Sequence, residues 1–101
     1  MSYEGYEALG AVRLRFRRYD DAAACLAKAV QANPRFSVLY ALQASALAMA
    51  GRIEEAKVLA RRLVELEPTF RALPFLEFAG FVKPETREAF AVAFREVGLP
   101  E

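Results

Sequence analysis

The sequence predicts an all-α fold, built as a stack of antiparallel helix pairs, and three observations lead to this prediction. First, residues 3–36 and 37–70 match when one segment is shifted by 34 positions, a period of one helix–turn–helix unit. Second, apolar residues recur at helical spacing within each half of these units. Third, glycine or proline stands where the predicted helices end. The matching pairs are Tyr6 and Tyr40, Arg18 and Arg52, Ala22 and Ala56, Val30 and Val64, Pro34 and Pro68, and Phe36 and Phe70.

Residues 3–36 are predicted to form the first helix pair. Tyr6 supplies a large ring near the start of the first helix, and the small Gly10 lets the second helix approach closely. Ala22 lies early in the second helix, where a bulky side chain would push the pair apart. Pro34 ends the second helix, because the residue before a proline disfavours the helical region.

Residues 37–70 are predicted to form the second pair. Ser37 is the expected N-cap of the helix over 37–50, and Gly51 is expected to end it. The uncharged run from Phe36 to Gly51 is shorter than the ~20 apolar residues that span a bilayer, so it predicts a central helix packed on both sides. Acidic pairs at the second-helix starts complement the helix dipole, which favours a structural role over catalysis or metal binding. These pairs are Asp20 with Asp21 and Glu54 with Glu55.

Residues 71–101 depart from the repeat but keep a helical pattern. A short helix is expected to begin near Pro74, with Phe75, Phe78 and Val82 on one face. A last helix is expected from about Pro84 to Val97, closed by Gly98. Its Phe90 and Phe94 are predicted to fill the space against residues 53–66 and 74–82, while Ala91 and Val92 lie on its other side. This atypical pair would cap the stack, as terminal repeats do.

The residues matched at this period resemble two consecutive tetratricopeptide repeats over residues 3–70. The resemblance implies a right-handed superhelical stack and a single domain over residues 1–101. Repeat one would be residues 3–36, repeat two 37–70, and the degenerate third repeat or cap 71–101. Two positions depart from the family pattern: Arg13 stands in place of a large residue such as tyrosine, and Gln43 in place of leucine.

A second resemblance concerns the C-terminal tetratricopeptide modules of bacterial signalling proteins, which carry an adenylate-cyclase or a DNA-binding winged-helix domain. It implies that this chain is the C-terminal end of a longer cytoplasmic protein. The segments that carry it are residues 33–36 (Asn-Pro-Arg-Phe), 51–56 (Gly-Arg-Ile-Glu-Glu-Ala), 67–70 (Glu-Pro-Thr-Phe) and 98–101 (Gly-Leu-Pro-Glu).

The family resemblance implies a concave groove, lined by the first helices of successive repeats. By helical spacing its lining is Glu7, Ala11, Leu14, Val38, Ala41, Ser45, Ala48, Phe75, Ala79 and Val82. The clamp that some family members use for chaperone C-termini is not expected, because its positions hold other residue types. These are Glu7, Ala11, Leu42, Ala72 and Leu76. The groove is therefore expected to receive an apolar or amphipathic segment of a partner, or of the parent protein.

Two alternatives to partner binding remain. The chain could form homodimers through its terminal helices, covering Ala91, Val92 and the region of Phe81, or it could act as a spacer. Either role would still belong to a structural module with no chemistry of its own.

Enzymatic function is not expected, because the chain lacks histidine, a glycine-rich phosphate loop and a partner for its one cysteine, Cys25. No cofactor or metal is expected. The formal net charge of +1 gives no reason to expect binding to nucleic acid or to a membrane surface. The single cysteine and the absence of a secretory signal in residues 1–10 favour the cytoplasm.

Overall fold

The computed structural model describes residues 1–78 and 83–101, and all regular secondary structure in these ranges is helical. The fold-class prediction is therefore confirmed. The helices are α1 (Tyr3–Arg15), α2 (Tyr19–Ala32), α3 (Ser37–Met49), α4 (Ile53–Leu66), α5 (Ala72–Phe78) and α6 (Pro84–Glu96).

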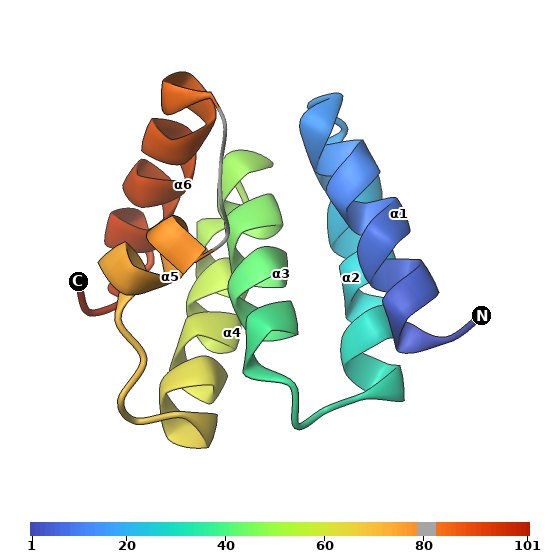
Figure 1. Ribbon diagram of the computed structural model, residues 1–101, viewed down its shortest axis with the longest axis horizontal. Coiled ribbons are helices and arrows are strands. Elements are labelled where there is room, and N and C mark those ends of the chain that lie inside the picture. The colour runs from blue at the N-terminus through green and yellow to red at the C-terminus, as the bar shows by residue number, and fades with distance from the viewer. Residues whose placement is uncertain (79–82) are drawn as a thin grey trace.

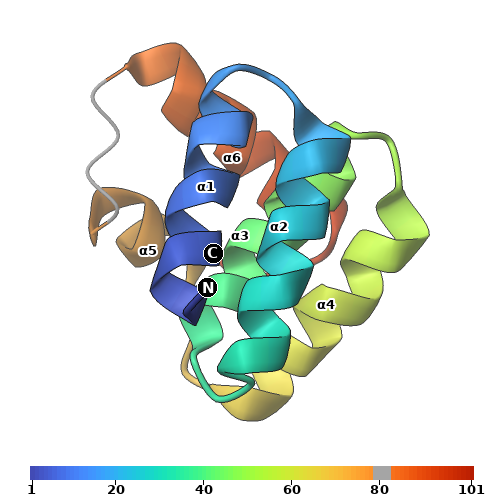
Figure 2. The same cartoon turned by 90° about the vertical axis from the view of Figure 1, so that its right-hand side faces the viewer.

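Helices α1 to α4 run antiparallel to their neighbours in the chain, and the short α5 lies across them (Figure 1). Helices α1, α3 and α5 lie on one side of the molecule, while α2 and α4 lie on the other (Figures 1 and 2). Helix α2 packs against α1 of its own pair and also against α3 of the next pair. This alternation is what a stack of helix pairs requires, because each interior helix must bury more than one face. Within the described residues, no helix is long and apolar enough to cross a membrane.

The close approach of paired helices depends on small residues at the predicted positions. A Cβ atom added to Gly10 would lie 2.7 Å from the Cγ atom of Leu26, which is itself fully buried. Ala22 and Ala56 are fully buried, and so is Ala44, which takes the place of Gly10 in the second pair. The predicted packing of the two helix pairs is therefore confirmed.

The turns inside the two pairs share one backbone conformation. Gly51 has a φ of 81° between α3 and α4, and the residue 34 positions earlier, Arg17, has a φ of 59° between α1 and α2. Only glycine adopts this left-handed region without a steric cost. The first pair thus keeps a turn geometry that suits glycine, although an arginine occupies it.

The predicted N-cap of α3 is off by one residue. Ser37 is the first residue of the helix, and Phe36 is the N-cap, with an extended backbone whose carbonyl accepts a hydrogen bond from the Leu39 N–H at 3.1 Å. A serine side chain does cap α1, where Ser2 Oγ accepts a hydrogen bond from the Gly5 N–H at 3.2 Å.

The last helix packs in a place that the sequence did not predict. Helix α6 runs antiparallel beside α3 (Figure 1) and packs mainly against α3 and α5, rather than against α4. Phe90 and Phe94 are buried, as predicted. The Phe94 ring meets three other rings edge-on, with centroid distances of 5.7 Å to Phe75, 6.2 Å to Phe90 and 6.4 Å to Phe70.

Phe75 and Phe78, which were predicted to share one face of this helix, differ in burial. Phe75 joins the aromatic cluster, but the Phe78 side chain is 83% exposed. Helix α5 buries Ala72 and Leu76, and Phe78 lies two residues, or about 200°, beyond Leu76. It therefore points away from the core. The third residue of the predicted face, Val82, lies outside the described residues.

The C-terminal tail returns to the start of α5. The Ala72 N–H donates to the Pro100 carbonyl at 2.7 Å, and the Leu73 N–H donates to a Glu101 oxygen at 3.2 Å. Leu99 is buried in the same core as Phe94. Residues 98–101 thus hold α5 and α6 together while supplying acceptors to N–H groups that the first turn of a helix leaves unpaired.

Candidate functional site

The residues predicted to line a groove are divided between open and buried positions. On α1, Ala11 is exposed, and Glu7 and Leu14 are partly buried. On α3, Val38 is partly buried, whereas Ala41, Ser45 and Ala48 are buried. Phe75 belongs to the aromatic cluster, and Ala79 and Val82 lie outside the described residues.

The centre of the predicted groove is closed on α3. Ala41 and Ser45 have no exposed surface, and Ser45 Oγ donates to the Ala41 carbonyl of its own helix at 2.8 Å. The sequence could not show this closure, because it depends on how the other helices pack around α3. A partner could therefore reach only the groove residues that flank Ala41, Ser45 and Ala48. The binding role of the ten predicted groove residues stays a prediction.

Helix α1 has far more open surface than α3. It packs along α2, whereas α3 packs against α2, α4 and α6. Val12 is 48% exposed and Phe16 is 70% exposed, and Ala8 is exposed beside them. The sequence analysis did not single out these residues, although the 34-residue period relates Val12 to the fully buried Ala46.

Opposite charges lie at the two ends of α1. Glu4 is in the first turn, and Arg13 and Arg15 are in the last turn. Burial, followed by repulsion from the Glu4 carboxylate, raises the pKa of Glu7 above its ordinary value. The acidic end of α1 therefore has carboxylates that a nearby cation would stabilise.

The acidic pairs at the second-helix starts form ion pairs that recur at the repeat period. The Arg18 guanidinium lies 2.6 Å from the Asp21 carboxylate, and the equivalent Arg52 and Glu55 lie 2.7 Å apart. Arg52 also donates to Asp20 at 3.1 Å, which links the two pairs. The hydrogen bonds from Arg52 to Glu55 lower the pKa of Glu55. The carboxylates at these positions are thus engaged in structural ion pairs on an exposed surface.

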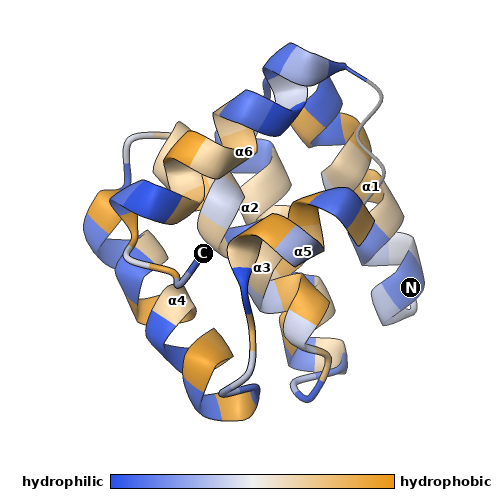
Figure 3. Cartoon of the chain, turned by 60° about the vertical axis from the view of Figure 1, so that its left-hand side comes forward, coloured by the Kyte–Doolittle hydropathy of each residue, from blue (hydrophilic) through white to orange (hydrophobic). Residues whose placement is uncertain are grey.

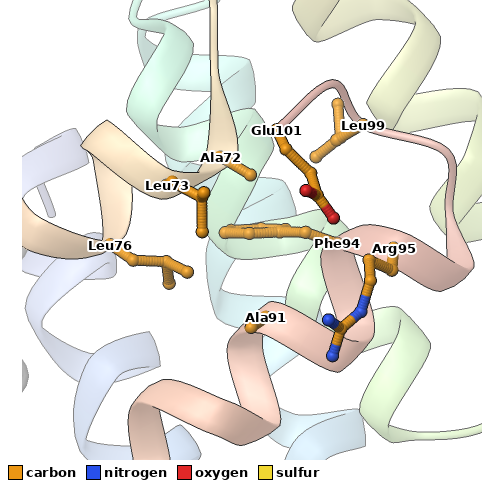
Figure 4. Close-up of a pocket in the computed structure, with 8 residues that line it drawn as sticks. All are labelled: Ala72, Leu73, Leu76, Ala91, Phe94, Arg95, Leu99 and Glu101. Carbon is orange, nitrogen blue, oxygen red and sulfur yellow. The ribbon is translucent and has the colours of Figure 1, made fainter.

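A small pocket lies between α5, α6 and the C-terminal tail. Figure 4 shows the Phe94 ring at its centre, with Leu73 and Leu76 on one side and Arg95 and Glu101 on the other. Its enclosed volume is about 20 Å³, which is room for about one water molecule, far below the ~300–1,000 Å³ of sites that hold small molecules. Among the described residues, no cluster of three or more histidine, cysteine or acidic side chains could hold a metal ion.

Comparison with protein-family models finds no family that matches the chain, and comparison with curated proteins finds no matching relative.

Proposed function

We propose that this chain is a protein-interaction module of the tetratricopeptide type, which binds an apolar or amphipathic segment of a partner or of its parent protein. The family assignment rests on the 34-residue sequence repeat and on the helix pairs, which recur with the same period. Two large apolar side chains on α5 support the binding role. Phe78 is 83% exposed and Leu73 is also exposed, and Figure 3 shows that hydrophobic residues make up most of this helix.

The exposed Phe78 is the observation that carries this proposal. A phenylalanine ring left in water forgoes about 1.5–3 kcal/mol of burial, and it makes no contribution to the core in this position. Aromatic side chains are over-represented at protein interfaces, where a pocket of the partner surrounds them. The exposed Phe78 ring fits an anchor for a partner segment, and Leu73, five residues earlier on the same short helix, offers a second exposed apolar side chain.

The wider setting follows from the same assignment. We propose that the module works in the cytoplasm of a bacterium as part of a signalling protein and that it catalyses no reaction. The bacterial signalling setting rests on the second resemblance alone, whereas the single cysteine supports the cytoplasm and the ion-paired carboxylates support the absence of catalysis. A homo-oligomerisation role is the second proposed function, and the exposed face of α1 favours it.

The test of partner binding is a titration of isotope-labelled protein with a model amphipathic peptide of about 14 residues, built from leucine, lysine and glutamate. Chemical-shift changes should saturate and centre on α5. Phe78→Ser should weaken binding at least about tenfold, because it removes the anchor. Leu66→Ser is the matched control, since Leu66 is 40% exposed on α4, on the other side of the molecule. Equal effects of the two substitutions, or no saturable shift at ~1 mM peptide, would contradict the proposal.

A further inference from the structure

The exposed side of α1, opposite α2, presents small and apolar residues between two charged residues. We call it the outer α1 face, formed by Glu4, Ala8, Ala11, Val12 and Arg15, all of which are exposed. Gly10, on the opposite side of the helix, is buried against Leu26 of α2. The outer α1 face therefore lies on the side of α1 that its own helix pair leaves open.

The repeat itself shows how the same face is used elsewhere in this chain. The residues 34 positions later are Leu42, Ser45, Ala46 and Met49, which correspond to Ala8, Ala11, Val12 and Arg15. Ser45 and Ala46 are fully buried, and Leu42 and Met49 are packed against the core. In the second pair, helices from outside the pair, α2 and α6, pack on α3 and run antiparallel to it (Figure 1). The equivalent position on α1 would thus take an antiparallel helix.

The charge pattern of α1 indicates which helix that is. Glu4 and Arg15 stand at equal distances from the point between Leu9 and Gly10, and Ala8 and Ala11 stand at equal distances on either side of the same point. When two copies of α1 pair antiparallel about a two-fold axis through this point, Glu4 of each copy lies opposite Arg15 of the other. Ala8 of each copy then lies opposite Ala11 of the other, so that the backbones can approach closely. The face is therefore complementary to itself, as a two-fold interface must be.

We propose that the outer α1 face is the interface of a two-fold symmetric homodimer, in which the two α1 helices pack antiparallel. This inference rests on the repeat and on the charges of α1, and it does not depend on partner binding at α5. The paired arrangement brings an arginine of the second copy to the end of α1 where Glu4 and Glu7 repel each other. Val12 loses its contact with water in the same step.

The expected dimer is weak. Helix α1 has 13 residues, so the contact between the two helices is about 20 Å long. Two helices in contact over this length bury less surface than the ~1,200–2,000 Å² that stable complexes bury. We therefore expect a dissociation constant on the order of 100 µM, which sedimentation or light scattering can measure at protein concentrations up to ~1 mM.

Charge reversal tests the register of the pairing. Glu4→Arg alone and Arg15→Glu alone should each weaken the dimer at least about tenfold, because each places like charges opposite each other twice. The double variant, with both reversals, should recover the original dissociation constant. A mixture of the two single variants should form heterodimers, since the extra arginine of one then meets the extra glutamate of the other. Added salt should weaken the original dimer and the mixed heterodimer alike.

Further variants distinguish this interface from an effect on the helix dipole and from self-association through α6. Glu85→Arg reverses a charge in the first turn of α6 and should leave the dissociation constant unchanged, which controls for the loss of a favourable helix-dipole interaction. Ala11→Arg places a bulky charge where the two backbones approach closely and should abolish the dimer, whereas Val92→Arg, at a residue 39% exposed on α6, should not. Circular dichroism of each variant shows whether it still folds.

Three results would overturn the proposal. A monomeric mass at ~1 mM protein in low salt would exclude the dimer. Dissociation by Val92→Arg, with no effect of Ala11→Arg, would place self-association on the cap. Failure of the double charge reversal to recover dimerisation, when both single variants dissociate and all variants fold, would exclude the antiparallel register. Recovery in the double variant and heterodimers in the mixture would establish it.

Discussion

Replacement of Phe94 by alanine is the sharpest test of how the C-terminal third is held to the helix pairs. The Phe94 side chain is 1% exposed, and its ring packs against those of Phe70, Phe75 and Phe90. These partners come from the segment before α5, from α5 and from α6 itself. Phe94 is thus the residue through which the parts of the cap meet.

The expected loss is large relative to the stability of the chain. Phe→Ala in a packed core costs about 3–5 kcal/mol, because the transfer free energy of the ring is lost and a cavity remains. Edge-on ring contacts add about 0.5–1.5 kcal/mol each beyond the buried area, so the upper half of that range applies. A domain of this size has a total of about 5–15 kcal/mol. We therefore expect a loss of about 4–5 kcal/mol and a decrease of more than about 12 °C in Tm.

The assay is guanidinium unfolding, followed by circular dichroism, with Phe78→Ala as the matched control. Both variants lose the same atoms, but Phe78 is in water, so its replacement should change the free energy of unfolding by less than about 0.5 kcal/mol. If the cap unfolds before the helix pairs, Phe94→Ala should show two transitions, the first losing the helicity of α5 and α6. A loss below about 1.5 kcal/mol in a single transition, or equal losses in the two variants, would refute the packing described for the cap.

Four other substitutions test the helix pairs. Gly10→Ala should cost about 1–3 kcal/mol through overpacking against Leu26, even though alanine favours helix by about 1 kcal/mol; unchanged urea unfolding would contradict the close approach. Arg17→Gly should raise the free energy of unfolding by about 0.5–1 kcal/mol, because it relieves a positive φ; calorimetry would show this as a higher Tm. Tyr40→Phe removes a 2.8 Å hydrogen bond to the Pro34 carbonyl and should cost about 0.5–1.5 kcal/mol in the same assay. Glu7→Gln should raise Tm at pH 7 but not near pH 3. The raised pKa means that folding favours the protonated acid, so the charged form opposes folding above that pKa.

The parts of the fold that could be predicted are those in which local sequence and long-range packing agree. Gly51 and Pro34 end helices, and Ala22 allows close helix packing, whatever surrounds the helix pair. The 34-residue period places similar signals in both pairs. The structure accordingly ends α3 before Gly51 and buries Ala22 completely. Where only a side-chain preference was available, as for Ser37, the prediction missed by one residue. Boundaries of helices commonly differ by this amount, since caps compete over one or two positions.

The candidate site was less predictable because it depends on contacts between distant segments. Helical spacing correctly grouped Ala41, Ser45 and Ala48 on one face of α3, but spacing does not tell whether another helix covers that face. The cover comes from the helices that pack on α3, and one of them, α6, begins at residue 84 and follows no repeat. The exposure of Phe78 was not predicted, for a related reason. In a seven-residue helix, two buried residues fix the inward direction, and the sequence does not reveal which two they are.

The first and last helices of this chain are covered to different extents, and this difference bears on function. At the C-terminal end, α6 and the tail cover α3 and α5, and the aromatic cluster around Phe94 replaces the contacts of a next repeat. At the N-terminal end, Val12 and Phe16 remain exposed, whereas the equivalent Ala46 is fully buried and the equivalent Ala50 is partly buried. The first helix pair thus exposes large apolar side chains at positions where the second pair buries small ones. This exposed apolar surface of the first pair would gain stability if another helix covered it. Because Glu4 and Arg15 frame that surface with opposite charges, the proposed pairing with a second copy of α1 would cover its apolar centre and pair its charged ends.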